Sequence, residues 1–240
     1  MKKKRVSIIM SAYNSKDFIK EAVDSVLNQQ GDFKLDLYVG IDGCKETLNE
    51  IKGYSNKINL YYSKENVGTY IIKNSLFNKI DDKSSIIVTF DSDDIMPLNF
   101  LAYYVERYQE GIIRLSGKNI KEGKQVGLCS PEGTIITTYE IFSKLGGYNS
   151  FRVGQDTDFI RRARKLKISQ KRLQDAPRFI RRIHDNSLTQ NSDTGFRSQY
   201  RRDIVNKNNN LIKEKKFVAD METVELLKIN ESYNDLGDIN

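Results

Sequence analysis

Three carboxylates follow a strongly apolar run in the middle of the chain. Residues 84–90 read Ser-Ser-Ile-Ile-Val-Thr-Phe and lead directly into Asp91, Ser92, Asp93 and Asp94. An apolar run without polar alternation is typical of a strand buried on both faces of a parallel sheet, and such sheets bind ligands at the carboxyl ends of their strands. In an extended segment, Asp91 and Asp93 lie on the same side and Asp94 points elsewhere. Two carboxylates so placed suit Mg²⁺ or Mn²⁺, which keeps open positions for phosphate oxygens.

The same acids can also be interpreted as the start of a helix. Pro97 suits a first helical turn, and apolar residues recur at helical spacing between Phe100 and Tyr108. A helix needs only one acid as its cap, however, and like charges clustered at the end of a buried strand cost free energy unless a cation is present. We therefore favour a metal site at Asp91 and Asp93 over a cap.

Segments typical of strands and helices alternate through the first half of the chain. Strand-like runs cover residues 6–10, 35–41, 58–62 and 84–90, and helix-like segments cover 15–27, 45–54, 72–80 and 97–110. This alternation predicts a right-handed, mostly parallel α/β layer. Beyond Gly111 we expect short strands at 112–115, 118–120 and 126–129, a hairpin turn at 121–124, a helix over 137–145, a helix from about 155 and a strand over 178–184.

The composition fits one domain with a single core. The chain has 240 residues, of which 38% are hydrophobic. No run is long and apolar enough to span a bilayer, and the basic first residues lead into a strand, so we expect a soluble, cytoplasmic protein. Cys44 and Cys129 have no metal-ligand partners nearby in sequence and are expected to be reduced thiols.

The net charge of +7 is unevenly distributed. Residues 159–202 contain 13 Lys and Arg against three acids. This stretch suits an anion, and a sugar nucleotide, an anionic lipid surface and a nucleic acid are all compatible with it. A solvated basic face explains most of these residues equally well.

Short motifs follow one another in order between residues 6 and 189. They are the segment 6–14, Ile41-Asp42-Gly43-Cys44, Asn66-Val67-Gly68 with Lys73-Asn74, Asp91-Ser92-Asp93-Asp94, Gly146-Gly147-Tyr148 with Gln155-Asp156, and His184-Asp185-Asn186-Ser187-Leu188-Thr189. Together they resemble the motifs of glycosyltransferase family 2, the inverting GT-A enzymes that use nucleotide-diphosphate sugars. Four positions depart from the family pattern: Ser11 replaces a proline, Ile41 an acid, Lys73 an arginine and Gln155 a glutamate.

The resemblance implies a role for individual residues. Asp156 would be the general base, and Asp91, Asp93 and His184 would hold Mn²⁺ or Mg²⁺. The residues that would bind the donor are Ser11, Ala12, Tyr13, Asn14, Asp42, Asn66, Gly68, Lys73, Asp91 and Ser92. Those that would bind the acceptor are Gly146, Gly147, Tyr148 and Gln155.

Two of these roles have simpler alternatives. Asp156 lies at the expected start of a helix, where it can be a cap, and where the helix dipole would keep it ionised and lower its basicity. His184, the only histidine, can be a surface residue or a structural hydrogen-bonding residue instead of a metal or diphosphate contact.

The resemblance also implies a fold and a reaction. The fold would be a GT-A, Rossmann-like α/β domain: a mostly parallel sheet flanked by helices, with a small mixed β region. Residues 1–192 would form this domain, with 1–110 binding the nucleotide sugar and 111–192 the acceptor, and 193–240 would be a helical or loosely ordered tail. The reaction would be metal-dependent inverting transfer of a sugar from a nucleotide-diphosphate donor, foremost a UDP-sugar, to a hydroxyl of a glycan or lipid-linked acceptor in polysaccharide biosynthesis. A peripheral contact with the inner face of an anionic membrane is a further expectation.

Two other classes of protein share part of this pattern. A nucleotidyltransferase has a similar sheet and also binds a metal ion through acidic residues. It normally carries a Gly-rich basic phosphate loop after the first strand, however, where this chain has Ser11-Ala12-Tyr13-Asn14. A nucleic-acid binder could use the basic stretch, but aromatic residues are sparse among its cations and no known module is present.

Overall fold

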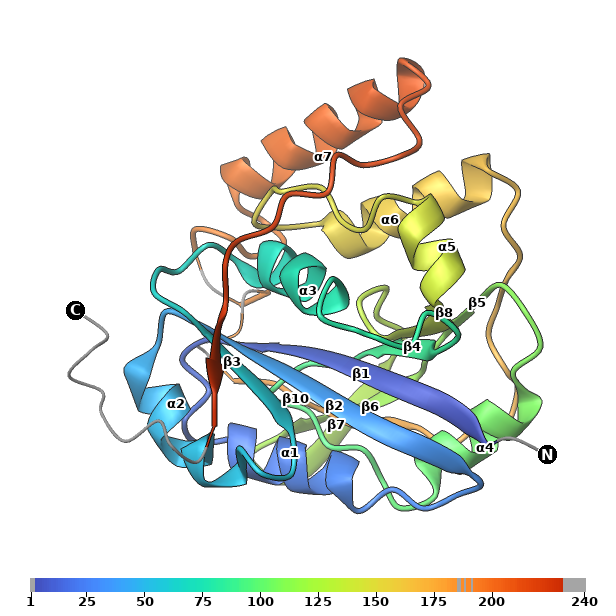
Figure 1. The fold of residues 1–240 in the computed structure, drawn as a ribbon. Coiled ribbons are helices and arrows are strands. Elements are labelled where there is room, and N and C mark those ends of the chain that lie inside the picture. The colour runs from blue at the N-terminus through green and yellow to red at the C-terminus, as the bar shows by residue number, and fades with distance from the viewer. Residues whose placement is uncertain (1–2, 185–186, 188, 191, 231–240) are drawn as a thin grey trace.

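The computed structural model describes residues 3–184, 187, 189–190 and 192–230. It contains one eight-stranded sheet with helices on both faces and a separate three-stranded sheet (Figure 1). The strand order of the large sheet is β11-β3-β2-β1-β4-β8-β5-β9. The expected α/β layer is therefore confirmed.

The centre of the large sheet is parallel. Its four strands are β1 (Lys4–Ala12), β2 (Phe33–Asp42), β3 (Asn59–Ser63) and β4 (Ile86–Thr89). Because they run in the same direction, the loops that follow all four emerge at one edge of the sheet. The remaining strands are β5 (Ile112–Arg114), β8 (Ile135–Thr138), β9 (Gln170–Lys171) and β11 (Leu227–Ile229), of which β8 is antiparallel to β4 and β11 to β3.

The helices divide between the two faces of the sheet. On one face lie α1 (Ile19–Leu27), α2 (Lys45–Ile51), which the 3₁₀ turn η1 (Lys52–Tyr54) extends, and α4 (Phe100–Arg107). On the other lie α3 (Thr69–Phe77), α5 (Tyr139–Lys144) and α6 (Gln155–Lys165), with α7 (Gln199–Lys213) outside them (Figure 1).

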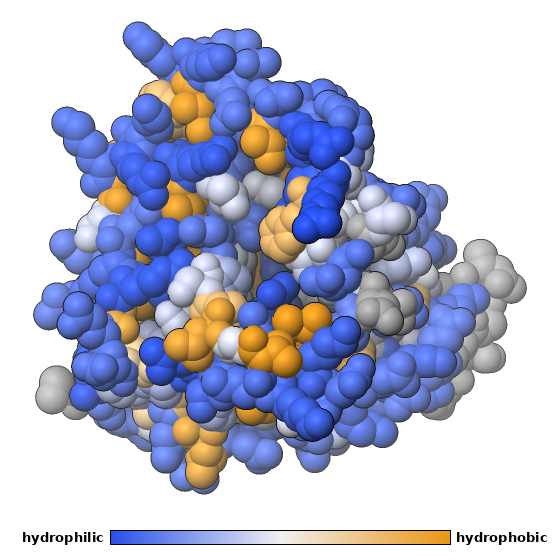
Figure 2. Space-filling model, turned by 180° about the vertical axis from the view of Figure 1, so that it is seen from behind, coloured by the Kyte–Doolittle hydropathy of each residue, from blue (hydrophilic) through white to orange (hydrophobic). Residues whose placement is uncertain are grey.

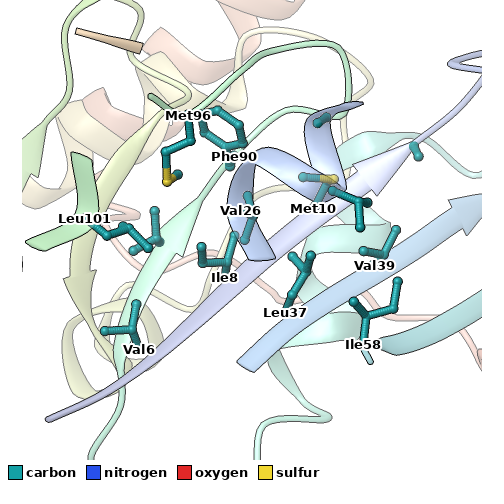
Figure 3. Packing of buried hydrophobic residues seen from close by; sticks show 14 of the residues in the cluster. Val6, Ile8, Met10, Val26, Leu37, Val39, Ile58, Phe90, Met96 and Leu101 are labelled. Atoms are coloured by element: carbon teal, nitrogen blue, oxygen red, sulfur yellow. The ribbon is translucent and has the colours of Figure 1, made fainter. Parts of the chain in front are cut away.

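Alternation along β1 gives each face its own core. Val6, Ile8 and Met10 point to the α1 side, where Val26, Leu37 and Leu101 pack against them (Figure 3). Ile9 points to the other side and joins a cluster that includes Ile72 of α3 and Phe159 of α6. All residues of β1 from Val6 onward are buried, as the apolar run predicts. Outside the core the surface is mostly hydrophilic, with small separate apolar patches on the face seen from behind (Figure 2).

The small sheet connects the acid loop to the second half of the chain. Its order is β10-β6-β7, formed by β10 (Phe179–Arg182), β6 (Gly117–Lys121) and β7 (Lys124–Cys129). Ile95, just after the acid loop, forms a bridge with Ile180 of β10. The segment that ends in His184 is thereby carried next to Asp91–Asp94.

Three local predictions were wrong or incomplete. The helix expected over 137–145 begins only at Tyr139, because the β-branched residues of Ile135–Thr138 form β8, and the Thr138 side chain caps the helix at the amide of Ile141. Helix α4 begins at Phe100 and not at Pro97, after Asn99 in a left-handed conformation with φ 61°. The pattern did not predict β11, which pairs with β3 near the end of the chain.

A turn with no strand partner, residues 145–148, is held by side chains from two helices. The fully buried Asn74 of α3 accepts a hydrogen bond from Tyr148 N (2.9 Å) and donates to Tyr148 O (2.9 Å) and Glu222 O (3.2 Å). Arg162 of α6 donates to Leu145 O and Gly147 O and pairs with buried Asp158 at 2.7 Å. Gly147 has φ +61°, and a Cβ there would lie 2.6 Å from Asn74 Oδ1. The turn therefore requires glycine and both helices.

We expect Asn74→Ala to lower the free energy of unfolding by about 3 kcal/mol or more, because it leaves several buried main-chain groups without partners at roughly 1–3 kcal/mol each. Urea denaturation followed by circular dichroism measures this. Asn78→Ala, one turn later and exposed, is the matched control and should change stability by less than about 0.5 kcal/mol. Equal losses in the two variants would contradict the anchoring role.

Candidate functional site

Four loops at the carboxyl edge of the parallel strands bring the predicted donor residues together. They follow β1, β2, β3 and β4, and they are joined by side-chain hydrogen bonds. The hydroxyls of Ser11 and Thr69 bond to each other, and Ser15 Oγ lies 2.9 Å from Ser92 Oγ. Ser11, Ala12 and Ser92 are buried in these contacts, so they shape the loops.

A hollow of about 320 Å³ opens between the loops after β1 and β2. It is lined by Tyr13, Asn14, Lys16, Gly43, Cys44 and Glu46. Tyr13 is 56% exposed, and Asn14 has φ 50°, a left-handed conformation that asparagine tolerates better than most residues. The hollow has an aromatic ring and several hydrogen-bonding groups, which is the chemistry that a nucleoside requires.

Asp42 precedes Gly43 of the hollow, and its side chain is held by the loop before α3. Its two carboxylate oxygens accept hydrogen bonds from Val67 N (2.7 Å) and Gly68 N (2.9 Å), and the residue is 2% exposed. Burial raises the pKa of Asp42, and the two amides partly offset the rise. Gly68 has φ 100°, which explains a glycine at this position. In the structure Asp42 therefore organises the loop that carries Asn66 and Gly68, and its direct contact with a nucleoside stays a prediction.

The three acids after β4 have three different partners. Asp91 Oδ1 lies 2.8 Å from the Lys73 ammonium, and Asp93 Oδ2 lies 2.9 Å from His184 Nε2. Asp94 is 3% exposed and accepts a hydrogen bond from Arg182 N. Burial raises the pKa of Asp94 well above its usual range, and the negative charges of Asp93 and Asp91 add to the rise.

Lys73 is a buried cation within the site. Burial by itself lowers the pKa of Lys73, but the Asp91 carboxylate outweighs burial, and the pKa is raised. Lys73 therefore remains charged, with its side chain 4% exposed while that of Asp91 is 45% exposed. A fixed positive charge beside an accessible carboxylate suits a ligand that carries both phosphate and hydroxyl groups.

Asp93 and His184 have a separation that fits two ligands of one cation. Ligands at 2.0–2.1 Å in neighbouring octahedral positions lie roughly 3 Å apart, and the two atoms are 2.9 Å apart. The His184 ring packs on Phe18 at 4.6 Å between centroids. Within the described ranges, no group of three or more His, Cys, Asp or Glu residues is arranged to hold a metal. Asp93 and His184 are therefore two possible ligands from the chain, and Asp91, a bound diphosphate or water would have to complete the set.

Asp156 lies in the first turn of α6, but it is not the cap. The N-cap is Gly154, whose carbonyl accepts the amide of Asp158. Asp156 Oδ1 accepts hydrogen bonds from Tyr70 Oη at 3.2 Å and from Thr157 N at 2.9 Å. Burial raises the pKa of Asp156, with the Thr157 amide and Lys73 opposing the rise. The helix dipole alone predicts the opposite direction, so desolvation by the surrounding protein is the larger effect.

The residues expected to bind the acceptor are inside the protein. Tyr148 is 1% exposed and Gln155 0% exposed, and Gly146 and Gly147 belong to the turn held by Asn74 and Arg162. In this arrangement the four residues position the start of α6, and with it Asp156. Their direct contact with an acceptor stays a prediction. Of the late loop, Asp185, Asn186 and Leu188 lie outside the described residues.

Two residues that the sequence did not single out complete the site. Tyr70 donates to Asp156, and burial raises the pKa of its phenol well above the ordinary value, so it remains a hydrogen-bond donor. Arg152 donates to Asn66 Oδ1 (2.7 Å) and Asn66 O (2.8 Å) and so joins the loop before α6 to the loop after β3. Each residue lies beside a recognised motif, but only the folded chain brings the contacting atoms together.

The fold and the site define the class of protein. A mostly parallel sheet with acids at the carboxyl ends of β2 and β4 is the GT-A arrangement, and the structure resembles solved GT-A enzymes. S. aureus TarS, residues 1–349 in complex with UDP-GlcNAc, has a TM-score of 0.61 at 18% identity over 77% of this chain and 60% of TarS. The mannosyltransferase PcManGT from Pyrobaculum calidifontis, in complex with GDP-Man and Mn²⁺, has a TM-score of 0.60 at 17% identity over 78% of this chain and 59% of PcManGT.

Sequence comparison gives the family. The model of Glycosyl transferase family 2 matches residues 7–207, so the chain belongs to that family. A protein of Bacillus subtilis (strain 168) described as the teichuronic acid biosynthesis glycosyltransferase TuaG is 28% identical over 92 residues, which are 37% of this chain and 36% of TuaG. The chain thus spans less than two thirds of the length of each of these relatives.

We expect Asp42→Ala to weaken UDP binding about tenfold or more, because two hydrogen bonds to a carboxylate that order residues 65–68 are lost. Isothermal titration with UDP and Mn²⁺ measures the affinity, and hydrogen exchange of the Val67 and Gly68 amides measures the order of the loop. Asp36→Ala, nearer the start of β2, is the control. Unchanged amide protection in Asp42→Ala would contradict the loop-organising role.

Proposed function

We propose that this chain is a metal-dependent inverting glycosyltransferase that moves a sugar from a nucleotide-diphosphate donor, a UDP-sugar foremost, to a hydroxyl of a glycan or lipid-linked acceptor. One observation carries the proposal. Helix α3 contacts both Asp91 and Asp156: Lys73 lies 2.8 Å from Asp91, and Tyr70 donates to Asp156 at 3.2 Å. Lys73 and Asp91 also influence the pKa of Asp156. This contact supports a single active site that contains the donor residues and Asp156.

The donor is proposed to lie across the four loops. Its base would occupy the hollow beside Tyr13 and Asn14, and its ribose would meet Asp91. Lys73 and the amide-rich loop that contains Gly68 would lie near the diphosphate. UDP is favoured because a structure with this fold contains UDP-GlcNAc; GDP remains the second candidate because another contains GDP-Man.

The ligand atoms of Asp93 and His184 suit a divalent cation. Asp91 would bind either the cation or the ribose of the sugar nucleotide. A mixed oxygen and nitrogen set favours Mn²⁺ over Mg²⁺, which prefers oxygen alone. The cation would neutralise the charge that develops on the leaving diphosphate. The residues of the chain hold this arrangement together: Phe18 packs on the His184 ring, and Arg182 donates to Asp93 O.

Asp156 is proposed to take the proton of the acceptor hydroxyl. Its raised pKa makes it a stronger base than an exposed aspartate, and Tyr70 fixes the orientation of the carboxylate. In an inverting reaction the acceptor attacks from the side opposite the leaving group, so base and diphosphate belong at opposite ends of the site. In the proposed arrangement, Asp156 on α6 would be at the acceptor end, and Asp93 and His184 would be at the diphosphate end.

A peripheral contact with an anionic membrane is proposed for the start of α7. Phe196 is 67% exposed and Tyr200 40% exposed, beside the exposed cations Arg197 and Arg202. Aromatic rings together with cations suit a lipid interface, and sedimentation with anionic vesicles tests this. No helix of the described part of the chain has the length and apolar character to cross a bilayer.

Asp93→Asn should lower Mn²⁺ affinity in the presence of UDP by about tenfold or more, because a charged ligand is replaced by a neutral one. The free Mn²⁺ signal in electron paramagnetic resonance reports the affinity independently of turnover. Asp175→Asn, on the surface before β10, is the control with the same chemical change. Retained Mn²⁺ affinity in Asp93→Asn would remove this residue from the metal site.

Asp156→Asn should lower the rate of sugar transfer by roughly 10²-fold or more, the usual size of general-base loss, with UDP–Mn²⁺ affinity close to wild type. In the wild type the rate should fall as the pH falls through the raised pKa of Asp156, since only the ionised carboxylate accepts a proton. Glu140→Gln, an exposed acid in the first turn of α5, is the control.

The assay begins with UDP-, GDP- and dTDP-sugars and Mn²⁺, scored by binding and by donor hydrolysis. If no donor binds or turns over, the proposed function is wrong. If a donor turns over but Asp156→Asn transfers at the wild-type rate, the base must be another residue.

A further inference from the structure

A second hollow lies at the other end of the large sheet. It has a volume of about 360 Å³ and is lined by Arg114 of β5, Arg164 of α6, Lys167, Ile168 and Gln170. Figure 1 shows β5 and the end of α6 on the opposite side of the molecule from α2, which borders the hollow beside Tyr13. Along α6, Arg164 at the hollow also lies eight residues after Asp156, which is about 12 Å of helix rise. The hollow is therefore separate from the proposed donor site.

Positive charge is concentrated around this hollow. Arg114 pairs with Glu132 at 2.8 Å, and repulsion from Arg114 adds to burial in lowering the pKa of Arg172. Glu132 is the single acid paired with these arginines in the described part of the chain. Arg164 and Lys167 are exposed, and neither has an ion pair or a side-chain hydrogen bond to another described residue. Clustered cations repel one another, and a bound anion relieves that repulsion.

Two details distinguish these cations from an ordinary solvated surface. The Nε atom of Arg114 is buried and has no hydrogen-bond partner among the described residues, although buried donors are normally paired. Lys167 has φ 57° and lies just after the last residue of α6. Its amide donates to Arg164 O, and the amide of Ile168 donates to Ala163 O. Glycine is the favoured residue at such a position, so a lysine there keeps its side chain at the hollow at the expense of backbone strain.

We propose that this hollow binds a phosphate group. A phosphate offers oxygens in several directions, which matches cations that arrive from β5, from the end of α6 and from the turn after it. Planar guanidinium groups bind two phosphate oxygens at once, and lysine adds a point charge. Ile168 supplies an apolar wall. A free phosphate ion and a phosphodiester within a larger ligand share this chemistry.

The test uses the full chain at low salt, without sugar nucleotide or added metal, so its outcome is independent of the proposed transferase activity. Inorganic phosphate and dimethyl phosphate are titrated separately by calorimetry, and the arginine Nε–H resonances are followed by NMR. We expect saturable binding with a shift of the Arg114 resonance, which is assigned by its loss in Arg114→Lys. Binding of inorganic phosphate alone identifies a site for the free ion, whereas binding of dimethyl phosphate as well identifies a site for a diester.

Arg164→Gln and Lys167→Gln should each weaken phosphate binding about tenfold, the loss of one charge-assisted hydrogen bond. Both residues are exposed, so both variants should fold. Lys144→Gln, an exposed lysine in the last turn of α5, makes the same charge change and should leave the affinity unaltered. Failure of phosphate to saturate, or equal affinity in all three variants, would show a solvated basic surface and overturn the proposal.

The variant Lys167→Gly distinguishes the contribution of the Lys167 side chain to phosphate binding from the strain of its backbone conformation. It should raise Tm by roughly 2–4 °C, because glycine adopts positive φ without strain, and it should weaken phosphate binding as Lys167→Gln does. A higher Tm with unchanged phosphate affinity would show that the lysine has no part in the site.

Discussion

The capture of the 145–148 turn by Asn74 and Arg162 is the constraint on which the rest of the site depends. Main-chain hydrogen bonds pair its amides at Gly146 and Gly147. Buried side chains satisfy Gly147 O and both main-chain groups of Tyr148. Asn74 lies on α3, next to Lys73, and Arg162 lies on α6, the helix that carries Asp156. The same contacts that satisfy the turn therefore fix Lys73 relative to Asp156, the two residues proposed to act on the donor and on the acceptor. The segment after α7 is attached to the same residues, because Asn74 also donates to Glu222 O.

Burial of charge controls the chemistry of the site. Lys73 remains charged because Asp91 compensates for its burial, while Asp94 and Asp156 have raised pKa values because desolvation is stronger than the hydrogen bonds they accept. Three carboxylates at the end of one strand would repel one another if all pointed the same way. The fold separates them by giving Asp91 a lysine, Asp93 a histidine and Asp94 a main-chain amide.

Hydrophobic patterns in the sequence predicted the strands and helices whose positions depend on their own residues. The apolar run before Asp91 forms β4, and the strand–helix alternation of the first half gives the parallel sheet. Two of the three errors occur where a contact between residues distant in sequence determines the structure. Helix α4 begins at Phe100, where Gln29 of the α1 side accepts the amide of Leu101 and donates to Pro97 O, and β11 exists because β3 presents a free edge to it. Neither contact leaves a periodic signal in its own segment.

By itself the sequence determined the fold class, the family and the set of residues that meet at the carboxyl edge, because hydrophobic alternation and ordered motifs are local properties of a chain. Only the tertiary structure decided what each residue does there. It placed Asp42 against the amides of Val67 and Gly68, placed Tyr148 and Gln155 in the core, and brought Tyr70 to Asp156. Those outcomes depend on burial and on partners far away in sequence, which set both the direction of a side chain and its pKa.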